Sequence, residues 1–328
     1  MQLIETKILF LLLILLWITT GMIALSSGSA GLDMMDIWLS LRGGAPENIR
    51  SLVLDLRLPR ALTAFAVGGL LAVAGVLMQA LLRNPLAEPY ILGTSGGAAV
   101  AALLAMMAGL GATLIDLAAF GGAMAATLLV FTIAQGSRTW TPTRLLLTGV
   151  VLAAGFSAAS TLLLAISPTE NLRGMLFWLM GDLNYAYTPA RALWLLVLVT
   201  LAGFVSARHL NVLARGDIQA SIVGLPVAKF RLLVFIVASL ATAVSVTSVG
   251  VIGFIGLIVP HLIRIVAGSD HRTLVPASAL AGGIILVISD TLARTLIAPL
   301  QLPVGTLTAA LGVPLFLFLM SRYRIRDN

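Results

Sequence analysis

The side chains that carry chemistry in enzymes are scarce in this sequence, and they are not spaced as in known metal or nucleotide sites. There is no cysteine, and the three histidines, His209, His261 and His271, are scattered. The sequence lacks the GxxxxGK[ST] loop that binds nucleotide phosphates and the HExxH pattern of zinc enzymes. We therefore expect no catalytic residue, no metal site and no cofactor bound by this chain.

A polar and basic break lies between two long apolar runs, at about residues 209–229. Asp217 suits the start of a short helix, Gly224 suits its C-terminal cap, and Pro226 prevents its continuation. A soluble partner could push on the membrane part at such a helix, although an ordinary amphipathic connector fits the pattern equally well. The residues of this candidate contact are Arg215, Asp217, Ala220, Ser221, Gly224, Leu225 and Pro226.

Composition indicates what surrounds these residues. Of the 328 residues, 59% are hydrophobic and 10% are charged, and the mean hydropathy is +1.07. Lipid must therefore be the main solvent, and continuous apolar runs without alternation favour helices over a barrel. We predict an all-α polytopic membrane protein, a single domain over residues 1–328. About ten runs are long enough to span a bilayer: 8–25, 58–82, 91–109, 112–134, 143–167, 190–208, 231–250, 251–267, 274–293 and 303–321.

The distribution of basic residues predicts the orientation, because cytoplasmic loops are enriched in Lys and Arg. With the N-terminus inside, seven arginines fall outside and the other 13 of the 20 basic residues fall inside. The net charge of +7 is then a consequence of topology, and nucleic-acid binding is not needed to explain it. We expect both termini in the cytoplasm, residues 31–57 as an external loop with at most one short helix, and a short non-spanning segment at 169–182. The first apolar run is longer than a signal peptide core, so we expect it to be retained.

Several long motifs resemble the FecCD family, the membrane subunits of type II ABC importers for ferric siderophores, haem and cobalamin. These motifs are GVLMQALLRNPLAEP at residues 75–89, LGTSGG at 92–97, GVIGFIGLIVPHLIR at 250–264 and LPVGTLTAALGVP at 302–314. The likeness covers roughly residues 50–320. It implies the type II ABC importer fold, a multi-pass protein of the bacterial inner membrane, and a homodimer with the pathway between its two copies.

The resemblance also implies partners. Two cytoplasmic ATPase subunits, which use ATP and Mg, would dock under residues 209–229, and a periplasmic or lipid-anchored binding protein would deliver substrate from outside. Arg57, Arg60 and Arg294 match the arginines that meet acidic residues of that binding protein. They run against the positive-inside rule, which an acidic partner would explain. Solvated loop charges or contacts with lipid phosphate are the alternative.

Gate and pathway residues follow by position from the same resemblance. The cytoplasmic gate corresponds to Asn84, Pro85, Leu86, Thr141 and Thr143, for which simple turn chemistry is the alternative. The pathway wall corresponds to Phe177, Trp178 and Met180, which also fit aromatic and apolar anchoring at the membrane interface.

Two functions of different class are compatible with these residues. The first is the permease of an ATP-driven importer for a metal chelate, with cobalamin, haem and a ferric siderophore all open; residues 177–182 favour the first two. The second is a secondary carrier or passive channel without an ATPase. Ionisable residues at mid-depth are scarce, which weakens ion-coupled transport because a coupling ion usually needs buried Asp, Glu or His.

Overall fold

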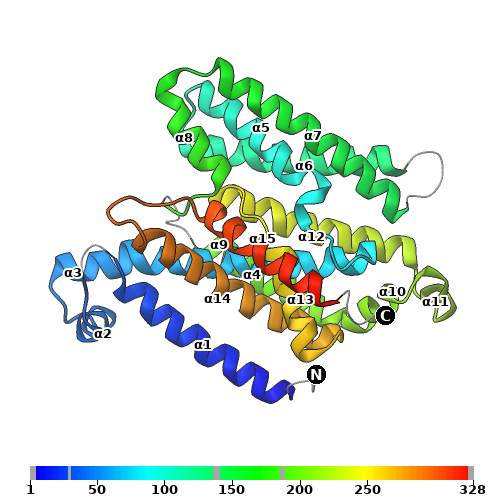
Figure 1. Ribbon diagram of the computed structural model, residues 1–328, viewed down its shortest axis with the longest axis horizontal. Coiled ribbons are helices and arrows are strands. Elements are labelled where there is room, and N and C mark those ends of the chain that lie inside the picture. The colour runs from blue at the N-terminus through cyan, green and yellow to red at the C-terminus, as the bar shows by residue number, and fades with distance from the viewer. Residues whose placement is uncertain (1–4, 29–30, 136–140, 185–188, 324–328) are drawn as a thin grey trace.

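The computed structural model describes residues 5–28, 31–135, 141–184 and 189–323, and within these ranges all regular structure is helical (Figure 1). The helices in chain order are α1 (Thr6–Ser26), α2 (Met34–Arg42), α3 (Glu47–Ser51), a π-helical segment (Leu52–Arg57), α4 (Leu58–Leu82), a 3-10 turn (Pro89–Leu92), α5 (Thr94–Met107), α6 (Ala112–Gln135), α7 (Pro142–Ile166), α8 (Thr169–Met180), α9 (Ala190–Val205), α10 (Ala207–Ala214), α11 (Asp217–Ile222), α12 (Val227–Val249), α13 (Ile255–Ala267), α14 (His271–Thr295) and α15 (Val304–Tyr323).

Each of the ten predicted spans coincides with a helix in this set. Within the described ranges, six helical stretches are long and apolar enough to cross a bilayer: α1, the continuous stretch Glu47–Leu82, α6, α7, α12 and α14. A seventh arises if α9 and α10 count as one span, although they bend by 64° at the break between them. The other three predicted spans coincide with shorter apolar helices, Thr94–Met107, Ile255–Ala267 and Val304–Leu319.

Helix α4 forms the centre of the molecule. Almost every side chain from Thr63 to Leu82 is buried, as expected for a helix that is apolar on all sides. Helices α9, α12, α13 and α14 pack around it, while α5, α6 and α7 form a further group that lies against α12 (Figure 1). This arrangement makes α4 the fixed element against which the other helices are positioned.

Glycines permit the closest helix contacts. A Cβ on Gly68 would overlap the carbonyl oxygen of Gly282 in α14, and a Cβ on Gly75 would overlap that of Gly256 in α13. Gly97 of α5 and Gly122 of α6 meet in the same way. In lipid no hydrophobic force drives helices together, so such close contacts contribute much of the packing energy.

Two boundary predictions are wrong, and the predicted polar break is more helical than expected. Residues 31–57 are not a loop with at most one helix: they contain α2, and α3 and the π-helical segment continue directly into α4. The eighth span begins at Ile255 instead of 251, because Gly250–Phe254 is a non-helical connection. The break at 209–229 includes most of α10, all of α11 and the first residues of α12.

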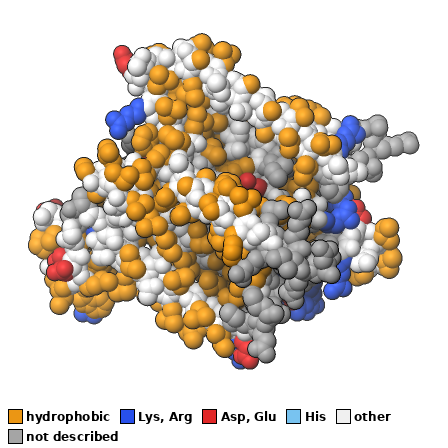
Figure 2. Space-filling view, in the orientation of Figure 1, with side chains coloured by type: hydrophobic (Ala, Val, Ile, Leu, Met, Phe, Trp, Pro, Cys, Tyr) orange, Lys and Arg blue, Asp and Glu red, His pale blue; other side chains and the backbone are white. Residues whose placement is uncertain are grey.

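The predicted inner and outer segments separate to opposite ends of the bundle. The start of α1, helices α10 and α11 and the end of α15 lie toward one end, whereas α2, α3 and α8 lie toward the other (Figure 1). Figure 2 shows hydrophobic side chains over most of the middle of this face, with Lys and Arg side chains toward its periphery. A bundle that is apolar between two polar ends fits a transmembrane arrangement.

Candidate functional site

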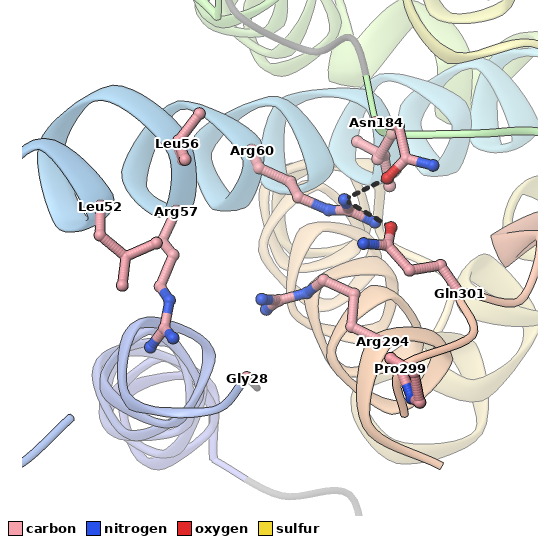
Figure 3. A pocket seen from close by; sticks show the side chains of 10 residues that line it. Gly28, Leu52, Leu56, Arg57, Arg60, Asn184, Arg294, Pro299 and Gln301 are labelled. Carbon is pink, nitrogen blue, oxygen red and sulfur yellow. Dashed lines mark hydrogen bonds between the residues drawn. The ribbon is translucent and has the colours of Figure 1, made fainter. Parts of the chain in front are cut away.

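The three arginines predicted to meet a partner line one cavity of about 290 Å3 (Figure 3). Arg57 ends the π-helical segment, Arg60 lies in the first turn of α4, and Arg294 lies in the last turn of α14. We call these three residues the arginine cluster. The three predicted residues therefore gather at one place, although Arg60 and Arg294 are far apart in the chain.

The arginine cluster has an internal acidic partner, Asp290, that the sequence analysis did not assign to it. Arg60 donates to Asp290 through Nε and Nη2, at 3.0 and 2.7 Å, and Arg294 Nε lies 3.2 Å from Asp290 Oδ2. Asp290 is only 2% exposed. Arg60 Nη1 also donates to Asn184 Oδ1 and Gln301 Oε1 (Figure 3). The four-residue spacing of Asp290 and Arg294 was a local signal for this pair.

Two members of the arginine cluster also hold the C-terminal end of α1. Arg57 Nη1 donates to the carbonyl oxygens of Leu25 and Ser26, at 2.6 and 3.0 Å. Arg294 donates to the carbonyl oxygen of Ala24 through Nη2, at 3.1 Å, and to a neighbouring carbonyl through Nη1. The last carbonyls of a helix lack partners within the helix, and cations near them are favourable. The arginine cluster thus fixes α1 against α4 and α14.

Helix α11 forms where the sequence analysis predicted it and ends as predicted. Gly224 has φ +84°, its N–H donates to the carbonyl oxygen of Ser221, and the N–H of Leu225 donates to that of Ala220. This is the Schellman ending, which favours glycine. Asp217 is the first residue of α11, as predicted, and its carboxylate accepts a hydrogen bond from Arg231 of α12.

The surface of α11 carries apolar side chains that the sequence analysis did not single out. Ile218, Ile222 and Val223 are 77%, 78% and 72% exposed. Ala220, by contrast, is fully buried, while Arg215, Ser221 and Pro226 are exposed. The signal was available, since apolar residues four positions apart share one face of a helix. Exposed apolar groups that cluster in this way are typical of protein or membrane contact surfaces.

Part of the predicted gate lies beside Arg215, one of the residues predicted to contact a soluble partner. Asn84, Pro85 and Arg215 line a cavity of about 490 Å3 together with residues of α10, α13 and α14. Asn84 Oδ1 accepts from the N–H of Leu86, which is 41% exposed. This bond forms the turn that follows α4.

The second predicted gate segment does not line this cavity. Thr141 and Thr143 are exposed at the start of α7, where Thr141 Oγ1 accepts from the N–H of Arg144. Threonine at this position satisfies an amide that the helix leaves unpaired. The structure thus assigns local turn and capping contacts to Asn84 and Thr141, and contacts across a dimer axis stay a prediction.

The cavity beside the gate is mostly basic. Arg83, Arg215 and Arg264 line it opposite one carboxylate, Asp270. The N–H of Arg272 and the side-chain amide of Asn211 both donate to Asp270, and these bonds lower the pKa of that carboxyl. The side chain of Arg264 is positioned from α4 by Gln79, whose Oε1 lies 2.8 Å from Arg264 Nη2.

Two of the three predicted pathway residues share a cavity. Phe177 and Trp178 of α8 line a space of about 640 Å3, together with Asp116, Arg173 and residues at the end of α12. Met180 does not line it, and its carbonyl oxygen packs against Gly305 of α15. An aromatic wall with a few charged groups is a common composition for a small-molecule site.

A half-buried carboxylate, Glu88, follows the gate residues and was not predicted as a site residue. Its Oε1 accepts from the N–H of Phe254 at 2.8 Å, and Tyr90 Oη accepts from the N–H of Ile252. Phe254 has φ +71°, which is unusual for a bulky residue. Burial raises the pKa of Glu88, although the bond from Phe254 opposes this shift. Glu88 thus attaches the segment after the gate to the connection between α12 and α13.

Comparison with known proteins decides the family. The sequence model of the FecCD transport family matches residues 12–322. The chain belongs to this family. Hemin transport system permease protein HmuU of Yersinia pestis is 41% identical over 325 residues, which cover 96% of this chain and 95% of HmuU. Vitamin B12 import system permease protein BtuC of Serratia proteamaculans is 38% identical over 318 residues, which cover 95% of this chain and 93% of BtuC.

Solved structures agree with the FecCD assignment. A metal-chelate type ABC transporter in an inward-facing conformation superposes with a TM-score of 0.83 at 31% identity, covering 97% of this chain and 99% of the other. PsaBC from Streptococcus pneumoniae, solved with a Fab, gives a TM-score of 0.58 at 16% identity, covering 87% of this chain and 95% of the other, and is similar in fold alone. The FecCD chain is thus an all-helical membrane permease subunit of the ABC-importer type, as its motifs indicate.

Proposed function

We propose that this FecCD chain forms, as a homodimer, the membrane pathway of an importer for a metal chelate and is driven by two separate ATPase subunits. Cobalamin, haem and ferric siderophores are the candidate chelates. Its relatives HmuU and BtuC, named for hemin and vitamin B12, support a large metal-centred substrate. The α10–α11 end faces the cytoplasm of a bacterial inner membrane, and a periplasmic or lipid-anchored binding protein delivers the chelate at the opposite end.

One observation carries this proposal: α11 presents exposed apolar side chains at a polar end of the bundle. Ile218, Ile222 and Val223 lie outside the core, and the Asp217–Arg231 pair connects their helix to α12. Burial of two or three such side chains in a partner supplies several kcal/mol, at about 1.5–3 kcal/mol for each fully buried side chain. A soluble ATPase that covers α11 therefore gains a direct connection to a long membrane helix.

The second support is the position of the gate beside this surface. Asn84 and Pro85 line the same cavity as Arg215. Only Gly216 separates Arg215 from the first residue of α11. A displacement of α11 therefore acts close to the loop that closes the cytoplasmic end in this proposal. Phe177 and Trp178 of α8 contribute the wall that meets the chelate farther out.

Reconstitution into vesicles tests the energy source. The chain is inserted alone or with the ATPase subunits of the proposed importer, and uptake of radiolabelled cobalamin, haem or a ferric siderophore is measured with binding protein outside and ATP inside. We expect uptake only when the ATPase subunits and ATP are both present. Uptake by the chain alone, driven by a proton or sodium gradient, would instead establish a secondary carrier.

A pair of matched substitutions tests the docking surface. Ile222→Asp places a charge in the proposed interface, and we expect it to weaken ATPase association by roughly tenfold or more, because about 1.4 kcal/mol corresponds to tenfold. Met35→Asp on α2 is the control, since Met35 is also exposed, at 64%, but lies at the other end. Equal association of both variants with the ATPase would remove α11 from the interface.

A further inference from the structure

Two guanidinium groups of the arginine cluster share one carboxylate. Arg60 and Arg294 line the cavity, and both pair with Asp290. Asp290 takes both Nε and Nη2 of Arg60, and it lies against Arg294 as well. The fork of Arg60 is therefore occupied by a carboxylate in the way that an external carboxylate would occupy it.

Asp290 lies inside the protein, where it occupies the guanidinium groups that a carboxylate of a partner would bind. It is 2% exposed, and the side chains of Arg60 and Arg294 are 14% and 11% exposed. In such a setting the interaction between charges is screened less than at an open surface. A second carboxylate that approaches the arginines is thus attracted by the guanidinium groups and repelled by Asp290.

We propose that Asp290 is a positioning residue that sets how tightly the arginine cluster binds the acidic partner. It holds Arg60 and Arg294 in fixed orientations while no partner is present, and it limits the affinity so that the partner can leave. This inference rests on the proposed docking of a binding protein at the arginine cluster. It adds a role for a carboxylate of this chain that opposes docking.

Two uncharged side chains also hold Arg60 in place. Asn184 and Gln301 each accept from Arg60 Nη1, at 2.7 and 3.2 Å, and Figure 3 shows both side chains reaching the same guanidinium. Since both are uncharged, they orient Arg60 without reducing its attraction for an anion. Asp290 is the group here whose removal increases the net positive charge of the cavity.

Docking measurements on the intact chain in lipid nanodiscs test this role. The probe is the purified substrate-binding protein of the proposed importer, and its affinity is measured at several salt concentrations. We expect Asp290→Asn, which keeps an oxygen acceptor for Arg60, to bind roughly three- to tenfold more tightly than the unsubstituted chain, with a steeper salt dependence. A purely structural role for Asp290 predicts the opposite, because a damaged cluster binds more weakly.

The control is Asp55→Asn, which removes the same charge from an exposed residue two positions before Arg57. An affinity of Asp290→Asn equal to or below that of Asp55→Asn, in protein of unchanged thermal stability, would overturn the inference. Failure of the unsubstituted chain to bind the probe would instead overturn the proposed docking itself.

A second variant keeps the test decisive if Asp290→Asn does not fold. Gln301→Glu adds a carboxylate at an exposed position that already contacts Arg60. By the same reasoning it should weaken docking by roughly three- to tenfold and flatten the salt dependence. Unchanged or tighter docking of Gln301→Glu would contradict the idea that internal carboxylates compete for Arg60.

Discussion

The guanidinium group of Arg231 in α12 donates a hydrogen bond to the carboxylate of Asp217, the first residue of α11. Arg231 is 6% exposed, so this bond joins a short surface helix to the buried side of a long one. At its other end α12 contacts the segment after α8, where the N–H of Asp182 donates to the carbonyl oxygen of Val249. One continuous helix thus connects the proposed ATPase contact with the proposed pathway wall.

Loss of the Asp217–Arg231 bond is expected to uncouple ATP hydrolysis from uptake of the chelate. Asp217→Ala removes a bond to a charged group, worth about 1.5–3 kcal/mol when buried and less here because Asp217 is partly exposed. We expect ATP hydrolysis by the assembled transporter to continue while uptake per ATP falls by roughly half or more. The measurement is the ratio of transported chelate to released phosphate in vesicles.

The reversed pair is the control for this prediction. Asp217→Arg combined with Arg231→Asp restores opposite charges at the same two positions, and it should recover part of the lost ratio. If Asp217→Ala leaves the ratio at the level of the unsubstituted chain, the bond does not transmit movement.

Glu88 is expected to make the stability of the chain depend on pH. Its folded-state pKa lies above the unfolded value because of burial, so the folded chain binds more protons than the unfolded chain between these two values. Stability is then highest below the unfolded pKa and decreases as pH rises toward the folded pKa. Melting temperature in detergent, measured at steps from about pH 4 to 8, should fall through that interval.

Two variants separate the charge of Glu88 from its hydrogen bond. Glu88→Gln keeps an oxygen for the N–H of Phe254 and should flatten the pH dependence. Glu88→Ala leaves that N–H without its acceptor and should cost about 1–3 kcal/mol of unfolding free energy. Identical pH profiles for the unsubstituted chain and Glu88→Gln would show that Glu88 does not titrate in this way.

Close glycine contacts around α4 are expected to tolerate no added methyl group. In Gly75→Ala the Cβ would overlap the carbonyl oxygen of Gly256 and lie 2.7 Å from its Cα, so the two helices must separate. We expect a loss of about 1–3 kcal/mol, seen as a lower melting temperature in detergent. The control is Gly21→Ala in α1, where nothing lies within 4 Å of the added Cβ. Equal melting temperatures for Gly75→Ala and Gly21→Ala would contradict the close contact between α4 and α13.

The apolar runs predicted most helices because a run of about 20 apolar residues has few alternatives in lipid. The prediction failed where distant contacts decide the backbone. Polar residues such as Glu47 and Asp55 suggested a loop, but here they extend α4 beyond its apolar part. Gly250–Phe254 is apolar, yet it is not helical, and Glu88, 166 residues away, binds the N–H of Phe254.

The candidate sites divide in the same way. Gly224 ends α11 through bonds within six residues, so local sequence was sufficient to predict it. Asp217 starts α11 as predicted, but its partner Arg231 lies 14 residues farther on in another helix and was not predicted. Asp290 binds Arg60 across 230 residues, and a single sequence carries no signal for such a pair. Residue types thus indicated the sites, while their partners required the structure.

The bonds from Arg294 to α1 have a consequence for biosynthesis. The ribosome makes α1 well before α14, and one of the two arginines that hold the C-terminal end of α1 is made 270 residues after Ala24. During synthesis α1 therefore stays in the bilayer without its contacts to α14 until that helix has been inserted. A helix that is made early is thus among the last to reach its full set of contacts.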